Sequence, residues 1–119
     1  MIIGIGVDVC DLERFETAVG RTPAMLETLL TASERALPAA SQAARFAAKE
    51  ALAKALGAPP GLGWHDAEVA RDSAGRPYFE MRGTVARAAS ALGVRRVHLS
   101  LTHDAGVATA FVVLEGDPA

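Results

Sequence analysis

The sequence predicts an α+β protein in which antiparallel strands accompany one long helix. The helix is the alanine-rich run from Ser41 to Leu56, which contains neither Gly nor Pro. A β-branched run over residues 2–9 predicts a buried strand near the amino end. Two later pairs of apolar segments, each joined by a Gly-containing turn, predict hairpins, and hairpins join antiparallel strands.

Length and composition restrict the possible classes of protein. The 119 residues suit a single domain, 1–119, and the 50% hydrophobic content indicates a globular chain. A formal net charge of −2 argues against a general nucleic-acid binder. The apolar start has no basic segment and is too short to span a membrane, so no membrane is expected. Cys10 is the only cysteine, which fits the reducing cytoplasm.

The predicted first strand carries a carboxylate near its carboxyl end. Asp8 follows the run that contains Gly4 and Gly6, and two glycines in a strand allow a backbone or a ligand to approach closely. A buried carboxylate is costly unless a cation or hydrogen-bond donors compensate it. Asp8 is therefore a candidate functional residue.

The long helix has a clear apolar stripe, and its other faces carry charged and aromatic side chains that could bind a ligand or a partner. Ser41 is expected to cap its start, and Gly57 is expected to end it in the left-handed conformation. The stripe consists of Ala44, Ala48, Ala51, Leu52 and Ala55, and the remaining faces carry Arg45, Phe46, Lys49, Glu50 and Lys54.

Lysine usage points to this same helix. The chain has 12 cationic residues, and only Lys49 and Lys54 are lysines. An ammonium group suits a phosphate as a compact point charge. The simpler alternative is an ordinary surface pair between Glu50 and Lys54, worth about 0.3–0.5 kcal/mol.

Shorter elements flank the long helix. Asp11 is expected to cap a helix that ends at Gly20, Thr22 and Pro23 start another, and Thr31 with Glu34 forms a capping-box pattern. After a loop over residues 58–63, strands are expected at 64–70 and 76–81, and Thr84 is expected to cap a helix that Gly93 closes. The last hairpin pairs 97–102 with 107–114 around a turn at 103–106.

Four motifs occur in a fixed order along this short chain. They are GIGVD ending at Asp8, FAAKEALAKALG ending at Gly57, GRP at 75–77, and SLTHD at 100–104. Together they resemble the small, bacterial-type holo-acyl-carrier-protein synthases of the 4′-phosphopantetheinyl transferase superfamily, from Ile3 to about Val113. The resemblance implies the fold of that superfamily, with an antiparallel sheet packed against the long central helix.

The resemblance also implies an activity. Similar proteins transfer the 4′-phosphopantetheine arm of coenzyme A to a serine of an acyl carrier protein and require Mg²⁺. It implies that Asp8 and Glu50 are the metal ligands, consistent with the preference of Mg²⁺ for carboxylates, phosphate oxygens and water. Lys54 is then expected at the transferring or leaving phosphate and Lys49 at a neighbouring phosphate. The group that takes the serine proton stays open between Glu50, a metal-bound water and a carboxylate of the partner.

Similar proteins are homotrimers with coenzyme A sites between subunits. That arrangement implies a coenzyme A pocket formed by Gly75, Arg76, Pro77, Ser100, Thr102 and His103. For His103 alone, a turn histidine with a local hydrogen bond is the simpler reading. The expected contacts with the acidic carrier protein are Arg14, Arg45 and Phe46, to which we add Arg21 as part of the same basic patch.

Parts of the sequence also fit two other functions. The GIGVD strand also resembles the first strand of ribonuclease H-like nucleases and sugar-kinase-type ATPases, but that fold needs a longer chain and more acidic positions. A trimeric module that binds carrier protein or a nucleotide without turnover is the other alternative, and the presence of Asp8, Glu50 and Lys54 argues against it.

The connection between Thr31 and the long helix is shorter than expected for the family and contains Pro38.

Overall fold

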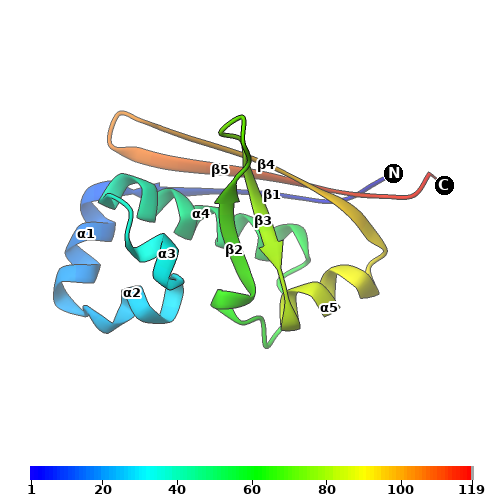
Figure 1. Ribbon diagram of the computed structural model, residues 1–119, viewed down its shortest axis with the longest axis horizontal. Helices are drawn as coiled ribbons and strands as arrows, with labels where there is room; N and C mark the ends of the chain where they lie inside the picture. Colours follow the sequence, from blue (N-terminus) through cyan, green and yellow to red (C-terminus); the bar gives the residue numbers. More distant parts are fainter. Residues whose placement is uncertain (119) are drawn as a thin grey trace.

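The computed structural model describes residues 1–118. Its main layer is a three-stranded antiparallel sheet in the order β1-β5-β4, with β1 at Ile2–Asp11, β4 at Val94–Asp104 and β5 at Val107–Gly116. The long helix α4, Ala39–Ala55, runs along one face of this sheet (Figure 1). A separate hairpin pairs β2, Ala67–Arg71, with β3, Pro77–Met81.

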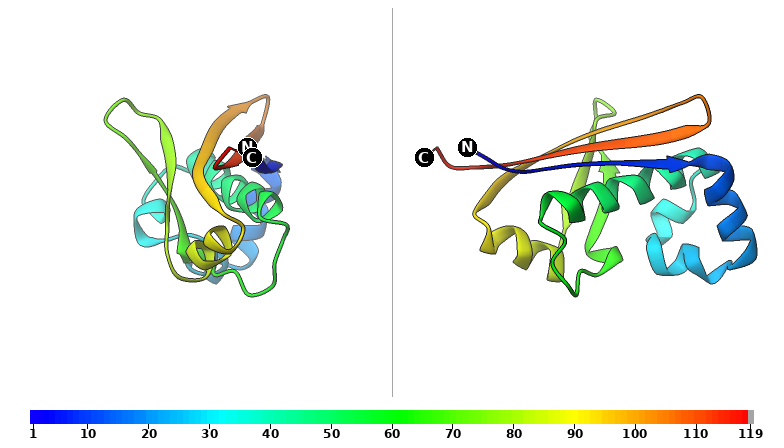
Figure 2. Two further views of the ribbon diagram at one scale, coloured as in Figure 1. Left: turned by 90° about the vertical axis from the view of Figure 1, so that its right-hand side faces the viewer. Right: turned by 180° about the vertical axis from the view of Figure 1, so that it is seen from behind.

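The smaller helices occupy the two ends of the molecule. At one end lie α1 at Leu12–Arg21, α2 at Ala24–Leu29 and α3 at Ala32–Arg35. Helix α5, Gly83–Ala91, lies towards the other end, where the two termini also meet (Figure 2). A 3₁₀-helix, Trp64–Asp66, precedes β2. The predicted α+β class and the packing of an antiparallel sheet against the long helix are confirmed.

Helix α4 lies unusually close to β1, and two glycines make this possible. A Cβ built on Gly4 would overlap the carbonyl oxygen of Ala55, and one built on Gly6 would overlap that of Ala51. The facing positions on β5 are fully buried and mostly small, namely Ala108, Ala110, Val112 and Leu114. The core is therefore a thin layer between the alanines of α4 and the inner face of the sheet.

Several local predictions are confirmed by hydrogen bonds or backbone angles. The N–H of Arg14 donates to Asp11 Oδ1 at 2.9 Å, so Asp11 caps α1. Thr31 and Glu34 form the complete capping box of α3. Gly57 and Gly93 adopt positive φ angles of 84° and 80° where α4 and α5 end.

The predicted start of α4 was wrong by two residues. The helix begins at Ala39 rather than at a Ser41 cap, because Pro38 already supplies the first carbonyl, which accepts from the N–H of Gln42 at 3.0 Å. The predicted end of α1 at Gly20 was wrong by one residue, since the helix continues through Arg21.

The region before β2 and α5 also differs from the prediction. The segment that begins at Trp64 is a 3₁₀-helix, and β2 starts only at Ala67. Thr84 does not cap α5. Instead, the backbone N–H and the hydroxyl of Thr84 both donate to Asp66 Oδ2, at 2.9 and 2.6 Å. The cap of α5 thus comes from a residue 18 positions earlier, which no local pattern could indicate.

The turn of the last hairpin is tighter than predicted. Only Ala105 and Gly106 separate β4 from β5, and their φ angles are 52° and 80°. Two residues with positive φ match the twist of the flanking strands in such a hairpin. The strands are therefore longer than expected, and His103 lies within β4 rather than in the turn.

The outer face of the sheet, opposite α4, is partly apolar. Ile5, Val7 and Val9 are 50–60% exposed on β1, and Phe111 is 46% exposed on β5.

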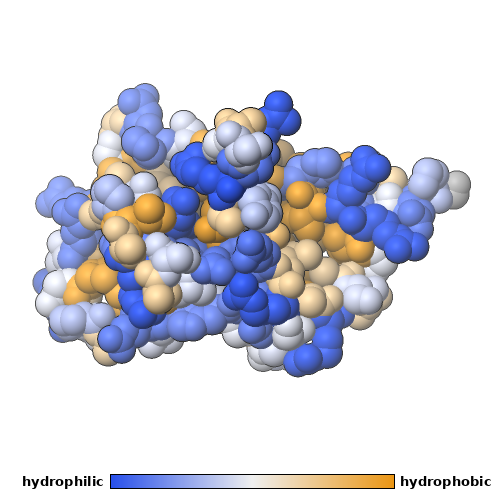
Figure 3. Space-filling model, viewed as in Figure 1, coloured by the Kyte–Doolittle hydropathy of each residue, from blue (hydrophilic) through white to orange (hydrophobic). Residues whose placement is uncertain are grey.

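On the face shown in Figure 3, strongly hydrophilic side chains gather over the β2–β3 hairpin, and an apolar patch lies beside it on the right. Within residues 1–118, no helix is both long and apolar enough to cross a bilayer.

Glu68 joins β2 to the start of α3. Its Oε2 accepts from the hydroxyls of Thr31 and Ser33, and its Oε1 accepts from Arg82 at 3.1 Å. These donors, Ser33 and Thr31 first, lower the pKa of Glu68 to about 2. The carboxylate form is therefore strongly favoured by the folded state.

We predict that Glu68 makes the stability depend on pH at acidic values. Its folded pKa is below its ordinary value of 4.5, so this stabilisation is complete above pH 4.5 and is lost as the pH falls towards 2. The pH-dependent part is on the order of 3 kcal/mol. Denaturant unfolding of wild type and Glu68→Gln at several pH values measures it.

The exposed Glu27→Gln variant serves as the control and should keep the wild-type pH dependence. Parallel curves for wild type and Glu68→Gln between pH 5 and 2 would contradict the prediction.

Candidate active site

Asp8 and Lys54 form an ion pair across the contact between β1 and α4. Lys54 Nζ donates to Asp8 Oδ1 at 2.9 Å and to the carbonyl oxygen of Val7 at 3.1 Å. The Asp8 side chain is 17% exposed and that of Lys54 is 52% exposed. The expectation that a cation compensates Asp8 is confirmed, and Lys54 pairs with Asp8 rather than with Glu50.

Glu50 lies one helical turn before Lys54, on the same side of α4. Partial burial raises the pKa of its carboxyl group, the nearby charge of Asp8 raises it further, and Lys54 lowers it. The pKa of Glu50 thus senses two charged neighbours from different elements. Asp8, Glu50 and Lys54 converge on one place, as the sequence predicted.

This place offers two carboxylates and one ammonium group. No group of three or more His, Cys, Asp or Glu side chains able to hold a metal occurs among the described residues. A Mg²⁺ ion in a protein nevertheless usually has only one or two carboxylate ligands, because water molecules and substrate phosphates fill its other coordination positions. After burial, the charge of Asp8 is the second cause that raises the pKa of Glu50, and a cation between the two carboxylates would relieve this repulsion.

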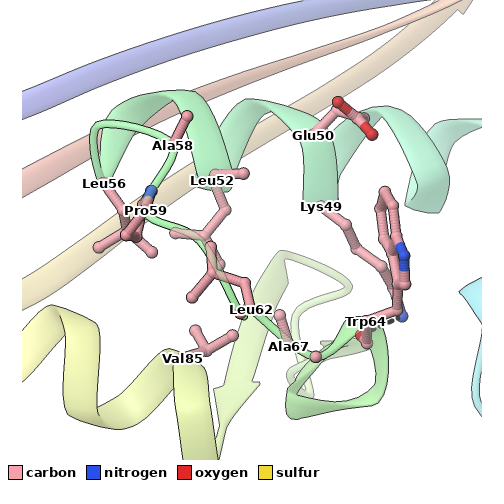
Figure 4. Close-up of a pocket in the computed structure, with 13 residues that line it drawn as sticks. Lys49, Glu50, Leu52, Leu56, Ala58, Pro59, Leu62, Trp64, Ala67 and Val85 are labelled. Atoms are coloured by element: carbon pink, nitrogen blue, oxygen red, sulfur yellow. Dashed lines mark hydrogen bonds between the residues drawn. The ribbon is translucent and has the colours of Figure 1, made fainter.

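A cavity of about 260 Å³ opens beside Glu50. Its walls are mostly apolar and include Leu52 of α4, Leu56 just after that helix, Leu62, Trp64 and Val85 (Figure 4). Neither Trp64 nor Val85 was predicted from the sequence to belong to the site. The signal available was weak, since an aromatic or aliphatic residue near a loop is usually part of the core.

Lys49 is not placed as predicted. Its side chain is only 2% exposed, and its Nζ donates to Glu34 Oε1, to the Leu29 carbonyl and to the Trp64 carbonyl. All three protons of the ammonium group are thereby used. Lys49 therefore has no free donor for a phosphate, and the prediction that it faces the reacting site was wrong.

Arg45 and Phe46 are also less accessible than expected. Arg45 is 4% exposed, one guanidinium nitrogen donates to the Ser41 carbonyl at 3.4 Å, and its Nε has no hydrogen-bond partner among the described residues. Burial, followed by the charge of Arg71, lowers its pKa. Phe46 is half-buried between the rings of Phe15 and Trp64, at centroid distances of 5.9 and 5.7 Å.

Neither residue presents the exposed side chain that a docking surface needs. The error arose because Phe15 of α1 and Trp64 of the 3₁₀-helix cover Phe46, whereas Arg45 lies beside residues of α3 and β2.

Arg14 and Arg21 of α1 are both exposed. They line a shallow hollow of about 490 Å³ together with Asp11, Glu13, Thr17 and Ala18. This hollow begins where β1 ends, three residues after Asp8. Two of the four residues predicted to contact the carrier protein thus lie together on the surface.

The other predicted residues gather elsewhere. Arg76, Pro77 and Ser100 line one hollow of about 410 Å³ between the β2–β3 hairpin and β4. Gly75 forms the preceding turn with a φ of 82°. Its N–H donates to the Asp72 carbonyl, and Asp72 Oδ1 accepts from the N–H of Arg76.

Sheet register separates this second group from Asp8. Asp8 pairs with the buried Ala110, whereas Ser100 pairs with the exposed Phe111, so Asp8 and Ser100 point to opposite faces. Thr102 shares the outer face with Ser100. His103 points towards the inner face, but β5 lies between its strand and that of Asp8. One copy of the chain does not bring the two groups together.

Comparison with known proteins agrees with this geometry. Residues 4–111 match the model of the 4′-phosphopantetheinyl transferase superfamily. The chain is 65% identical over 116 residues to the holo-[acyl-carrier-protein] synthase of Cutibacterium acnes, a match that covers 98% of this chain and all of that one. It is 60% identical to the protein of the same name from Clavibacter michiganensis, with 98% of both chains covered.

Solved structures of the same kind of protein superpose closely on this chain. The holo-[acyl-carrier-protein] synthase of Neisseria meningitidis superposes with a TM-score of 0.88 at 31% identity, over 97% of this chain and 99% of that one. The Helicobacter pylori synthase in complex with coenzyme A superposes with a TM-score of 0.82 at 31% identity, over 93% and 99%. The chain therefore belongs to the 4′-phosphopantetheinyl transferase superfamily and, within it, to the family of the holo-[acyl-carrier-protein] synthases.

Proposed function

We propose that this protein transfers 4′-phosphopantetheine from coenzyme A to a serine of an apo-acyl carrier protein of fatty acid or polyketide synthesis. The observation that carries the proposal is the meeting of Asp8, Glu50 and Lys54 beside an apolar cavity. The names of the relatives and the coenzyme A bound to the Helicobacter pylori structure support it. The lone, free Cys10 fits a reducing cytoplasm.

The reaction joins the serine oxygen to the β-phosphorus of coenzyme A. The bond from that phosphorus to the bridging oxygen breaks, adenosine 3′,5′-bisphosphate leaves, and the serine proton passes to a base. Such transfers depend mainly on positioning and on stabilisation of charge at the phosphoryl oxygens. Lys54 supplies a half-exposed ammonium group that can exchange the Asp8 carboxylate for a phosphate oxygen.

Asp8 and Glu50 are the residues that would hold Mg²⁺. When bound, the ion supplies Lewis-acid stabilisation of the diphosphate. The chain itself keeps the two carboxylates half-buried on a strand and a helix that lie in close contact, because Gly4 and Gly6 of β1 leave room for the backbone of α4. Lys54 limits the repulsion between the two carboxylates before any cation arrives.

We predict that the protein adds one phosphopantetheine to an apo-carrier in the presence of coenzyme A and Mg²⁺, and that Glu50→Gln loses about 100-fold or more of this activity. Glutamine keeps the shape of the side chain but removes the charge that a hard cation needs. Mass spectrometry of the carrier measures the product.

Glu27→Gln, an exposed substitution on α2, is the control for the change of charge and should stay fully active. No mass gain with any carrier would refute the activity, and wild-type turnover by Glu50→Gln would remove Glu50 from the metal site.

We also propose that the carrier docks on the exposed face of α1 through Arg14 and Arg21. Acidic helical partners are attracted by such a patch, and the attraction weakens with salt. The hollow that these arginines line adjoins the end of β1, so a docked carrier would present its serine near Asp8. Arg45 and Phe46 are left out of this surface because they are covered.

Arg14→Ala should raise the KM for the carrier severalfold while the KM for coenzyme A changes little. The reason is that the substitution removes a surface charge used only by the protein partner. Steady-state kinetics at two salt concentrations measure both constants. Arg95→Ala, which removes an equally exposed arginine at the other end of the molecule, is the matched control. Equal increases in both KM values would exclude a docking role.

We further propose a homotrimer whose coenzyme A sites lie between subunits. The partly apolar outer face of the sheet offers a surface for association. Arg76, Pro77 and Ser100 lie away from Asp8 in one copy, so a second copy would supply them to a shared site. Gly75, Thr102 and His103 belong to the same proposed pocket for coenzyme A.

Subunit mixing tests this arrangement. Glu50→Gln and Arg76→Ala should each be impaired alone, whereas trimers assembled from equal amounts of both should recover about one quarter of the wild-type activity. The recovered sites combine an intact Glu50 from one subunit with an intact Arg76 from its neighbour. A mixture of Glu50→Gln with Asp8→Asn is the control and should stay inactive. Failure of the first mixture to recover activity, with mixed trimers shown by mass, would place both residues in one subunit's site.

A further inference from the structure

The buried ion pair between Lys49 and Glu34 lies directly behind the candidate active site. The two side chains are 2% and 1% exposed, and Lys49 Nζ is 2.6 Å from Glu34 Oε1. The same Nζ donates to the carbonyl oxygens of Leu29 at 2.9 Å and Trp64 at 3.0 Å. The ammonium group thus joins α4 to the end of α2, to α3 and to the 3₁₀-helix.

Glu34 extends this set of contacts. Its Oε1 also accepts from the N–H of Thr31 at 2.9 Å, and its Oε2 accepts from the N–H of Val69 at 2.9 Å. The carboxylate is therefore bonded to the start of α3 and to β2 as well as to Lys49. Every partner is a fixed backbone group or a buried charge, which leaves the pair little freedom to shift.

Trp64 connects this ion pair to the active site. Its carbonyl oxygen accepts from Lys49, its ring stacks on Phe46 at 5.7 Å, and it lines the cavity that opens beside Glu50. Figure 4 shows the ring next to the Lys49 side chain, at the end of the cavity where the side chain of Glu50 projects from the helix. One hydrogen bond from Lys49, the residue before Glu50, thus joins this wall to the turn of α4 that carries Glu50.

A buried charge is a costly way to hold two elements together. Apolar residues of similar size often give equal or greater stability than a buried ion pair, so stability alone does not account for the pair. The ammonium group instead makes three directional hydrogen bonds, and these hold acceptors from three separate elements in a defined position relative to α4.

We propose that Lys49 is a positioning residue for the transfer reaction. Its hydrogen bonds hold Trp64 in place as a wall of the cavity and fix the turn of α4 that carries Glu50. This inference rests on the proposed role of Glu50 and of its cavity. Lys49 itself touches neither substrate nor metal. Its loss would let the Trp64 wall and the Glu50 carboxylate move relative to each other.

The chain provides its own reporter for the first half of this proposal. Trp64 is the only tryptophan, so the intrinsic emission of the free protein describes this wall alone. Lys49→Met keeps an unbranched side chain that is one atom shorter and removes the donor. We expect its emission to shift to the red and its quenching by acrylamide to increase. Lys54→Met is the matched control, because within residues 1–118 the ammonium group of Lys54 donates to Asp8 and Val7 and not to Trp64, so this variant should leave the emission unchanged.

Kinetics test the second half. Lys49→Met should raise the half-saturating Mg²⁺ concentration and the KM for coenzyme A by about fivefold or more, with the KM for the carrier within about twofold of wild type. A merely destabilised enzyme has fewer active molecules, which lowers the apparent kcat without changing these constants. Normal emission, or a shifted emission with unchanged Mg²⁺ and coenzyme A constants, would overturn the proposal.

Two further variants decide the matter if Lys49→Met does not fold. Trp64→Leu keeps the backbone acceptor of Lys49 but removes the wall, so it should raise the KM for coenzyme A in a folded protein. Glu34→Gln keeps the shape of the partner and should shift the emission of Trp64 in the same direction as Lys49→Met. Wild-type behaviour of both variants would refute the inference. Absence of transfer by the wild type would instead refute the proposed function, and the emission results would still stand.

Discussion

The close contact between α4 and β1 is the constraint on which the rest of the structure depends. Gly4 and Gly6 leave no side chain between the strand and the carbonyls of Ala55 and Ala51, so the helix lies directly on the backbone of the strand. Asp8, two residues further along β1, then reaches Lys54 on α4. A larger residue at either glycine would move the helix outward and separate the charges that form the candidate active site.

The two lysines of α4 show how much position on a helix matters. They are five residues apart, which places them well over a quarter turn from each other around the helix axis. Lys54 lies at the edge of the sheet and stays half-exposed, whereas Lys49 points under α2, α3 and the 3₁₀-helix and is buried. The helix is therefore enclosed on two sides, with the sheet on one and the small helices on the other, and Glu50 lies between them.

The sheet, in turn, divides the residues of the site into two groups. Its inner face positions Asp8 beside α4, and its outer face carries Ser100 among exposed apolar side chains. Because neighbouring residues of a strand point to opposite faces, no small rearrangement could join the groups within one chain. The same alternation that builds the thin core thus keeps Ser100 apart from Asp8 within one chain, which is the basis of the proposed site between subunits.

The sequence by itself determined the features that depend on a few neighbouring residues. The caps of α1 and α3 at Asp11 and Thr31, the glycine ends of α4 and α5, and the order of the four motifs could all be read from it. These signals are local, since a cap or a left-handed glycine satisfies backbone groups within one turn. The family followed from the motifs, and the antiparallel sheet on the long helix followed with it.

Only the tertiary structure decided which sides of α4 meet solvent. Periodicity separates an apolar stripe from the other faces, but it does not reveal whether distant segments cover those faces. Arg45 and Lys49 were expected on the surface and are buried, because α2, α3 and Trp64 lie over Lys49 and residues of α3 and β2 lie beside Arg45. The cap of α5 by Asp66 has the same origin. In each case the deciding contact joins residues far apart in the chain, and their approach is set by the packing of the whole core.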